Sequence, residues 1–473
     1  MQNLSAEAVR EDVELLLEVY REVHPAVDRY RDELTVTRRE EAERALHDLA
    51  ASGTDTLTLY GAVSQWLATL RCDHSKSEYP EAFVTWRRRR PSHLPFRFIT
   101  DGERLLLTVA AQVSGLSPGD EVYTVEGMPV PELLNRAGEM ISVDGYTDHV
   151  ILRRLEENSD LMGSGLDHYL PVLFGVRETA TVTVRRSGGE LQRVVLPLIP
   201  FDAWKELSPG TYRKDFGNSV HLEFPAPGVA LLRIDTFVNY RTPVDAAALY
   251  RTVNANLAGT NTRSLIIDLR SNGGGSTDAQ IQLQRAIARV PFQFQRPGQI
   301  ATLNLERFAP HLGTWDPSAL KPDPGAFKKL SENRYEEIPT PGDLRFETLS
   351  PTANAFRGDV ILLLGANNAS GVTHFASKLV DQGRVIVVGE PTGGSAEGAN
   401  AGILFFLTLP NSGIKTRVPA IRQFIDVDAP EPGIGITPHY EVRPTLRERF
   451  QGRDPVFEFA LSIAVGSKPP SRR

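Results

Sequence analysis

Three short stretches of the sequence carry residue types that could do chemistry. The first, Asn272-Gly273-Gly274-Gly275, follows the apolar run 264–269 and precedes a helix-start pattern at 276–278. A glycine loop between a buried strand and a helix N-terminus presents free backbone N–H groups and the positive end of the helix dipole. Such a loop can bind a phosphate or a developing oxyanion, or it can be only a tight turn. The absence of a P-loop lysine and of the dinucleotide-binding spacing disfavours the phosphate alternative.

The second stretch centres on Ser370, which lies between the apolar run 360–364 and a helical pattern beginning at Val372. A serine at a strand-to-helix junction lies at the carboxyl edge of a sheet, and the N–H of Gly371 points the same way, where it could bind an oxyanion. This is the logic of a nucleophile elbow, although the G-x-S-x-G pattern of α/β-hydrolases is missing. The alternative is that Ser370 only caps the helix.

The third stretch is Asp73-His74-Ser75, at the end of an amphipathic helical pattern around 56–70. Histidine titrates near neutral pH and can act as a general base, but a lone histidine is usually structural or solvated. His374 is one helical turn after Ser370, so we expect it to point away from a site at the helix N-terminus.

Two further patterns are weaker. Ser412-Gly413-Ile414-Lys415 matches S-x-x-K, but it lies between two strand patterns and is better explained as a hairpin turn. Asp426-Val427-Asp428 lacks the glycine and the later ligands of an EF-hand loop, so we expect no calcium site there.

The elements that must position these residues fall into three parts. Residues 1–90 have helical periodicity, 91–205 have short alternating strands with a helical insertion at 131–178, and 206–473 alternate strands with helices. The third part predicts an α/β layer with crossovers, built on the apolar strands 229–234, 264–269, 360–364 and 385–388. Within it, residues 287–350 predict a long irregular excursion.

Two details belong to the first two parts. The turn Pro118-Gly119-Asp120, which feeds a strand, resembles the carboxylate-loop half of a PDZ domain. The run Arg87 to Arg90 is expected to be a solvated edge, because its surroundings are not basic.

Composition sets outer bounds on function. The chain of 473 residues has 52 Lys and Arg against 59 Asp and Glu, a formal charge of −7 that disfavours a nucleic-acid-binding role. The single cysteine, Cys72, excludes an internal disulfide and a multi-cysteine zinc site. No apolar run is long enough for an integral membrane segment. The start lacks signal-peptide features, so the sequence leaves open a cytoplasmic protein or an exported, periplasmic one whose leader was removed.

Five motifs in order resemble the serine peptidase family of the C-terminal processing (tail-specific) proteases and the tricorn core protease. The resemblance runs over about residues 5–445, and its motifs are 265–275, 368–370, 387–394, 409–413 and 435–438. It implies an α/β, crotonase-like peptidase core (206–473), a PDZ-like β module (91–205), and an N-terminal helical segment (1–90) that carries the catalytic histidine.

The resemblance also implies catalytic roles. The tail-specific branch pairs its serine with a lysine, but Ser395 occupies that position here and no lysine lies between Lys378 and Lys415. The tricorn-like branch uses a histidine in an Asp-x-His or Asp-Gly-His-Thr context, which Asp73-His74 resembles. That branch implies Ser370 as nucleophile and His74 as base, with Glu431 as the orienting carboxylate and Asp428 as its alternative. The oxyanion donors would be Gly371 with Gly273 or Gly274.

The expected function is therefore a serine peptidase that cleaves a peptide or protein substrate through an acyl-enzyme, without a metal or cofactor. One alternative is an ester or amide hydrolase on the same scaffold. Another is a catalytically silent homologue that binds peptides or lipids. The oligomeric state and the cleavage specificity stay open.

Overall fold

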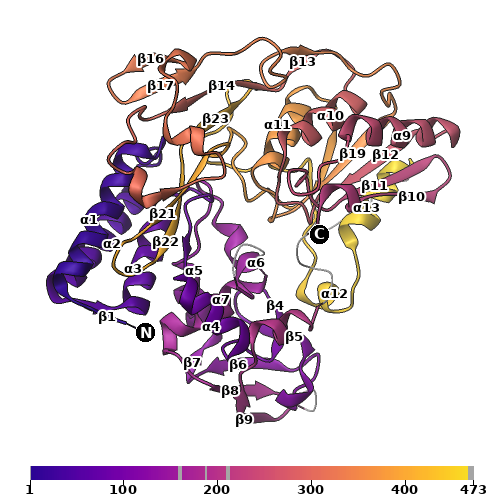
Figure 1. Cartoon of the computed structure of the whole chain (residues 1–473). Coiled ribbons are helices and arrows are strands. Elements are labelled where there is room, and N and C mark those ends of the chain that lie inside the picture. The colour runs from indigo at the N-terminus through magenta and orange to yellow at the C-terminus, as the bar shows by residue number, and fades with distance from the viewer. Residues whose placement is uncertain (1, 158–161, 187–188, 209–213, 467–473) are drawn as a thin grey trace.

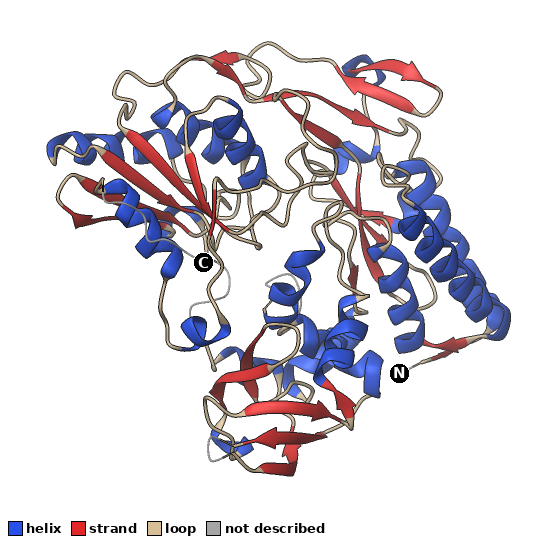
Figure 2. Cartoon of the chain, turned by 180° about the vertical axis from the view of Figure 1, so that it is seen from behind, coloured by secondary structure: helices blue, strands red, loops and turns tan. Residues whose placement is uncertain are grey.

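The computed structural model describes residues 2–157, 162–186, 189–208 and 214–466. Figures 1 and 2 show a helical N-terminal part, a β module at the bottom of the view and an α/β part, with strands along the top that connect the N-terminal part to the α/β part. No helix among the described residues has the length and hydropathy needed to cross a membrane.

The N-terminal part is helical, as the sequence predicts. Its helices are α1 (Ala6–Val23), α2 (Glu33–Ser52), α3 (Thr56–Ala68) and α4 (Glu81–Arg89), with the two-residue strands β1 (Asn3–Leu4) and β2 (Thr54–Asp55) pairing at its edge. The expectation of a solvated arginine run is wrong at Arg87, which is fully buried. Its guanidinium donates to the carbonyls of His168, Ser92 and Asp167, and these bonds offset the cost of burying the charge.

The β module is one antiparallel sheet in the order β4-β5-β6-β8-β9, with β7 paired to β6. The predicted helical insertion leaves the sheet after β7 and returns at β8. The strands are β4 (Phe96–Thr100), β5 (Leu105–Ala110), β6 (Glu121–Val125), β7 (Met128–Pro129), β8 (Thr179–Arg185) and β9 (Leu191–Pro197); the helices are α5 (Val130–Gly138), α6 (Ile151–Glu156) and α7 (Gly165–Phe174), with α8 (Phe201–Lys205) following β9.

The α/β part contains a six-stranded sheet in the order β10-β11-β12-β19-β20-β24. All neighbours are parallel except β10 and β11. The strands are β10 (Val220–Ala226), β11 (Val229–Ile234), β12 (Ser264–Asp268), β19 (Asp359–Leu364), β20 (Ile386–Gly389) and β24 (Tyr440–Glu441). This confirms the predicted α/β class, and the neighbouring strands β12 and β19 bring the loops that follow them to the same sheet edge.

Helices cover both faces of this sheet. Apolar side chains of α9 (Ala246–Gly259), α10 (Thr277–Ile287) and α11 (Gly371–Asp381) pack on one face, and those of α13 (Pro455–Ala464) pack on the other. The short helix α12 (Leu446–Phe450) precedes α13. Burial on both faces explains why the central strands are continuously apolar.

The excursion predicted to be irregular contains part of a four-stranded sheet, β16-β17-β14-β23. It also contributes β15 to a sheet in the order β15-β21-β22-β3, in which the hairpin β21–β22 pairs with the strand that follows the His74 loop. The bounds are β3 (Ser77–Glu78), β13 (Phe292–Gln293), β14 (Gln295–Ile300), β15 (Leu312–Gly313), β16 (Phe327–Ser331), β17 (Arg334–Glu337), β18 (Thr348–Leu349), β21 (Leu404–Thr408), β22 (Lys415–Pro419) and β23 (Arg422–Ile425).

One hydrophobic core joins parts that are far apart in the sequence. It contains buried side chains of the N-terminal helices and of the β module together with Phe405, Leu407 and Val418 of the β21–β22 hairpin. The hairpin therefore lies with the N-terminal part in space, although it falls in the 206–473 range of the sequence.

Candidate active site

Ser370 is half-buried in a turn between a strand and a helix. It follows β19 by a short loop and directly precedes α11, with φ 51° and ψ −123°. A positive φ is uncommon and strained for a residue with a side chain. Its side chain makes no capping hydrogen bond, although it occupies the N-cap position. The geometry therefore argues against a simple capping role and fits a serine held in a strained turn.

The glycine loop lies directly against Ser370. A Cβ built on Gly274, whose φ is 115°, would lie 3.0 Å from the Cβ of Ser370 and 2.9 Å from the nitrogen of Gly371. A side chain would therefore collide with the serine turn, and glycine is required for both the approach and the conformation. The structure thus brings together the two loops that the sequence singled out separately.

Two buried asparagines connect the glycine loop and the Ser370 turn through hydrogen bonds. The sequence analysis assigned them no role. Asn368 donates to the carbonyls of Leu269 and Asn272 at 2.6 and 2.8 Å, and its side-chain oxygen accepts from Gly365 at 2.7 Å. Asn272 donates to the carbonyl of Ile234. Each amide satisfies backbone groups that the irregular loops leave without partners. The sequence signal for this role is an asparagine four residues after the end of each apolar strand.

The backbone N–H groups of the glycine loop and of the Ser370 turn differ in whether they already donate a hydrogen bond. The N–H of Gly274 donates to Asn272 Oδ1 at 2.8 Å. The N–H groups of Gly273 and Gly371 donate to no other described residue. Two of the three expected oxyanion donors are thus available, and Gly274 contributes space for close approach rather than a free donor.

The His74 loop, between α3 and β3, reaches the segment that follows β20. The buried Asn400 side chain donates to Cys72 Sγ at 3.5 Å. His74 is also close enough to His374 to affect its titration: burial and then the charge of His74 lower the pKa of His374 to about 4. His374 Nε2 accepts a hydrogen bond from the N–H of Ala399 at 3.2 Å. The N-terminal histidine therefore lies beside the helix that Ser370 opens.

The loop is held there by residues 142–149, between α5 and α6, which we call the bridging segment. On one side it contacts the His74 loop. Ser142 Oγ donates to the carbonyl of Ser75 at 2.6 Å, and the N–H of Gly145 donates to the carbonyl of Arg71 at 2.9 Å. On the other side, Thr147 Oγ1 donates to the carbonyl of Gly393 at 2.7 Å.

The contact of Thr147 with Gly393 lies close to the Ser370 turn. A Cβ on Gly394, the next residue, would lie 2.7 Å from the Cα of Ala369. The bridging segment therefore links the His74 loop to the Ser370 turn through a short chain of contacts.

The two expected carboxylates lie at the surface of the molecule. Glu431 and Asp428 are both exposed, and their side chains form no hydrogen bond or ion pair with any residue in the described ranges. They lie on a surface turn in which Ala429 has φ 36°. The role of Glu431, or of Asp428 as its alternative, stays a prediction.

The lysines are also away from the serine. Lys378 is two helical turns after Ser370, and its ammonium contacts Asp426 Oδ2 at 2.8 Å. Lys415 lies on β22, 3.7 Å from Glu81. Ser395, in the position of a family lysine, is buried and accepts the N–H of Glu397 at 3.3 Å.

Asp73, His74 and Asp144 form the one described group of side chains with metal-ligand spacing, their ligand atoms lying within 4.8 Å of one another. Asp73 already forms ion pairs with Arg154 and, at 3.1 Å, with Lys76. These cations balance the carboxylate charge, so the group does not suit an added divalent ion. Asp144 was missed by the sequence analysis, because it lies about 70 residues from the histidine without a motif of its own.

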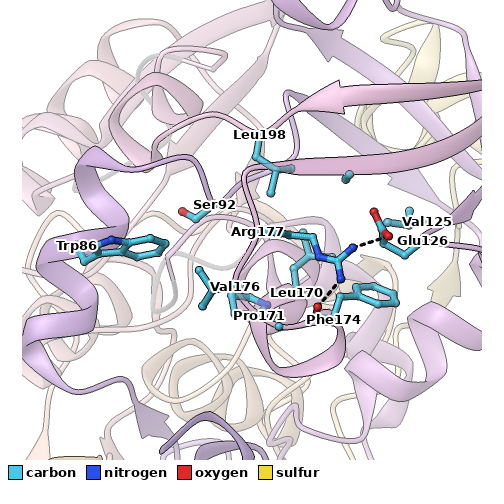
Figure 3. A pocket seen from close by; sticks show the side chains of 12 residues that line it. Trp86, Ser92, Val125, Glu126, Leu170, Pro171, Phe174, Val176, Arg177 and Leu198 are labelled. Carbon is cyan, nitrogen blue, oxygen red and sulfur yellow. Dashed lines mark hydrogen bonds and ion pairs between the residues drawn. The ribbon is translucent and has the colours of Figure 1, made fainter. Parts of the chain in front are cut away.

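Figure 3 shows a mainly apolar pocket in the β module, remote in sequence from Ser370. Side chains of α4, β6 and α7 line it, including Trp86, Val125 and Phe174. Arg177 lies across it and forms an ion pair with Glu126. None of the candidate catalytic residues lines this pocket.

Comparison with known proteins agrees with this arrangement. Residues 228–442 match the model of peptidase family S41, which spans the strands and loops around Ser370 and Gly274. The crystal structure of mature CPAF superposes with a TM-score of 0.65 at 16% identity, covering 97% of this chain and 98% of that one. Mature CPAF complexed with lactacystin gives 0.63 at 16% identity, covering 97% and 100%. At this identity the two structures show a shared fold. A search of curated proteins finds no significant match.

Proposed function

We propose that Ser370 is the nucleophile and His74 the general base of this chain, a serine-type peptidase whose residues 228–442 match peptidase family S41. The single observation that carries the proposal is the Ser370 turn: a strained, non-capping serine at a helix N-terminus, packed against a glycine that has no room for a side chain. Its substrate is a peptide or protein.

The mechanism follows from the chemistry of these groups. His74 takes the proton of the Ser370 hydroxyl as Oγ attacks the scissile carbonyl, since serine is a weak nucleophile at neutral pH without a base. The carbonyl oxygen becomes an oxyanion, bound by the N–H groups of Gly371 and Gly273 at the positive end of α11. His74 then returns its proton to the leaving amine, and water hydrolyses the acyl-enzyme.

Two finer features belong to the same proposal. The 206–473 part would have a crotonase-like core, supported by its parallel sheet with helices on both faces. The 91–205 part would be a PDZ-like module, supported by its antiparallel sheet and by the N–H of Gly119, which donates to the carbonyl of Leu107 at 2.8 Å in the turn before β6. The resemblance assigns the third catalytic role to Glu431, or else Asp428.

The test compares labelling by a fluorophosphonate probe with cleavage of a denatured protein, read as new termini by mass spectrometry. Ser370→Ala should abolish labelling and lose most of the turnover while remaining folded. Ser412→Ala, in the S-x-x-K hairpin turn, is the matched control and should keep both. Wild-type turnover in Ser370→Ala would refute the proposal, and labelling with cleavage of esters but not peptides would favour the ester-hydrolase alternative.

A further inference from the structure

Asp144 is a buried carboxylate with one oxygen that has no hydrogen-bond partner. It is 4% exposed, and its Oδ1 accepts the N–H of Asp73 at 2.8 Å. Its Oδ2 is fully enclosed and accepts no hydrogen bond. A buried carboxylate oxygen without a donor is costly. A functional role would explain why this unpartnered oxygen is present. The metal-ligand atom of Asp144 lies within 4.8 Å of that of His74.

The surrounding charges make the two aspartates differ. Asp73 pairs with Arg154 and Lys76, and Arg154 also donates to the carbonyl of Ser142 at 2.6 Å. These cations hold the pKa of Asp73 low against the effect of burial. Burial, and then the Asp73 carboxylate, raise the pKa of Asp144. The remaining titratable neighbours of Asp144 are Tyr30 and Cys72, whose pKa values are raised chiefly by burial.

Both carboxylates lie near His74, and the charge of His74 helps to lower the pKa of Asp73. Arg154 and Lys76 form ion pairs with Asp73, whereas Oδ2 of Asp144 accepts no hydrogen bond, so Asp144 has the carboxylate oxygen that is still available to the imidazolium. A histidine that acts as a general base becomes positively charged in the transition state, and a carboxylate at its second nitrogen fixes the tautomer and stabilises that charge. The bridging segment supplies the rigidity, because Ser142 and Gly145, on either side of Asp144, bond to the His74 loop.

We propose that Asp144, rather than Glu431, is the positioning residue of His74: its free carboxylate oxygen accepts the imidazole N–H that faces away from Ser370. This inference rests on the proposed roles of Ser370 and His74. The proton taken from Ser370 stays on the imidazole until it passes to the leaving amine. The carboxylate would then come from the insertion of the β module, and the catalytic groups from three separate parts of the chain.

The test is the pH dependence of kcat/KM in Asp144→Asn. Asparagine keeps an oxygen for the Asp73 N–H but loses the anion, so kcat should fall on the order of 10²- to 10⁴-fold. The acid limb should also move to lower pH, because the imidazolium loses a stabilising charge. A purely structural role would lower the folded fraction without moving this limb. Urea unfolding, with circular dichroism, measures the folded fraction of each variant.

Asp167→Asn is the matched control. Asp167 is a second fully buried aspartate, whose pKa burial raises to about 6, and its oxygens are satisfied by Leu94 and Ser164. This variant should leave the acid limb in place. If Glu431→Gln moves the limb and Asp144→Asn does not, the inference is overturned while the Ser370 and His74 roles stand. If Ser370→Ala retains turnover, the proposed function fails instead.

Discussion

The hydroxyl of Tyr30 donates a hydrogen bond to Glu397 Oε1 at 2.7 Å, across 367 positions of the chain. Arg29 and Arg422 form ion pairs with the other carboxylate oxygen, and the N–H of Gly433 donates to Oε1 at 3.2 Å. Glu397 thus ties the loop after α1 to two loops of the α/β part. This buried cluster holds the N-terminal part in place beside the candidate active site.

Glu397→Ala is expected to be strongly destabilising. Arg422, whose side chain is 6% exposed, would keep a buried charge without its carboxylate, a loss of about 3–5 kcal/mol in the free energy of unfolding. Arg29→Ala should cost no more than about 1 kcal/mol, because that side chain is 37% exposed. Urea denaturation measures both. Equal losses in the two variants would contradict the assignment of Glu397 as the buried centre of the cluster.

His74→Ala should reduce kcat about as much as Ser370→Ala, and the double variant should be little worse than either, because groups that act as one unit are not additive. In the wild type, kcat/KM should rise with pH through a pKa near that of histidine, about 6.5 unless neighbours shift it. Lys378→Met tests for a lysine base, and its kcat should be unchanged. If the Lys378→Met variant is inactive and the His74→Ala variant is active, the general base is Lys378 rather than His74.

Gly274→Ala is expected to lower kcat on the order of 10²- to 10³-fold, comparable to losing an oxyanion donor. The new Cβ would lie 2.9 Å from the Gly371 nitrogen and would displace that N–H. Gly127→Ala is the control, since Gly127 also has a positive φ, 82°, but has open space around it. Steady-state kinetics on both variants give the comparison. A changed KM with an unchanged kcat would assign the glycine loop to substrate binding instead.

His24 should make the fold less stable in acid. Burial, followed by Arg39 and Arg422, lowers its pKa to about 3. The unfolded chain, with a histidine pKa of about 6.5, therefore binds a proton that the folded state does not. This contribution to stability is present above about pH 6.5 and is lost as pH falls, by about 1.4 kcal/mol per pH unit.

The variant His24→Asn tests this expectation. Asparagine offers an oxygen in place of Nδ1, which accepts the N–H of Ala26 at 3.1 Å. The slope of unfolding free energy against pH, between pH 4 and 6, should decrease by about one proton. His47, which is exposed on α2, is the control position: His47→Asn should leave the slope unchanged.

Local patterns were sufficient to predict the α/β class, the central strands, and the serine and glycine loops. Each of these depends on short apolar runs and on the turn that follows, which neighbouring residues determine. The carboxylate near His74 could not be predicted in this way. Asp144 lies near the histidine because an insertion of the β module contacts the His74 loop, about 70 residues earlier in the chain. Arg87 was misjudged because its partners, the carbonyls of His168 and Asp167, come from a distant helix.

The pairing of β3 with β22 has a consequence for how the protein is made. Translation yields the His74 loop early and the β21–β22 hairpin hundreds of residues later, so the shared core of the N-terminal helices and the hairpin stays incomplete on the ribosome. Contacts of such long sequence separation form slowly. A growing chain that has not yet reached Gly433 also lacks the anchor of the bridging segment, whose Tyr146 N–H donates to that glycine's carbonyl at 2.8 Å. Under the proposed catalytic roles, proteolytic activity would therefore appear only after the chain has been synthesised beyond Gly433.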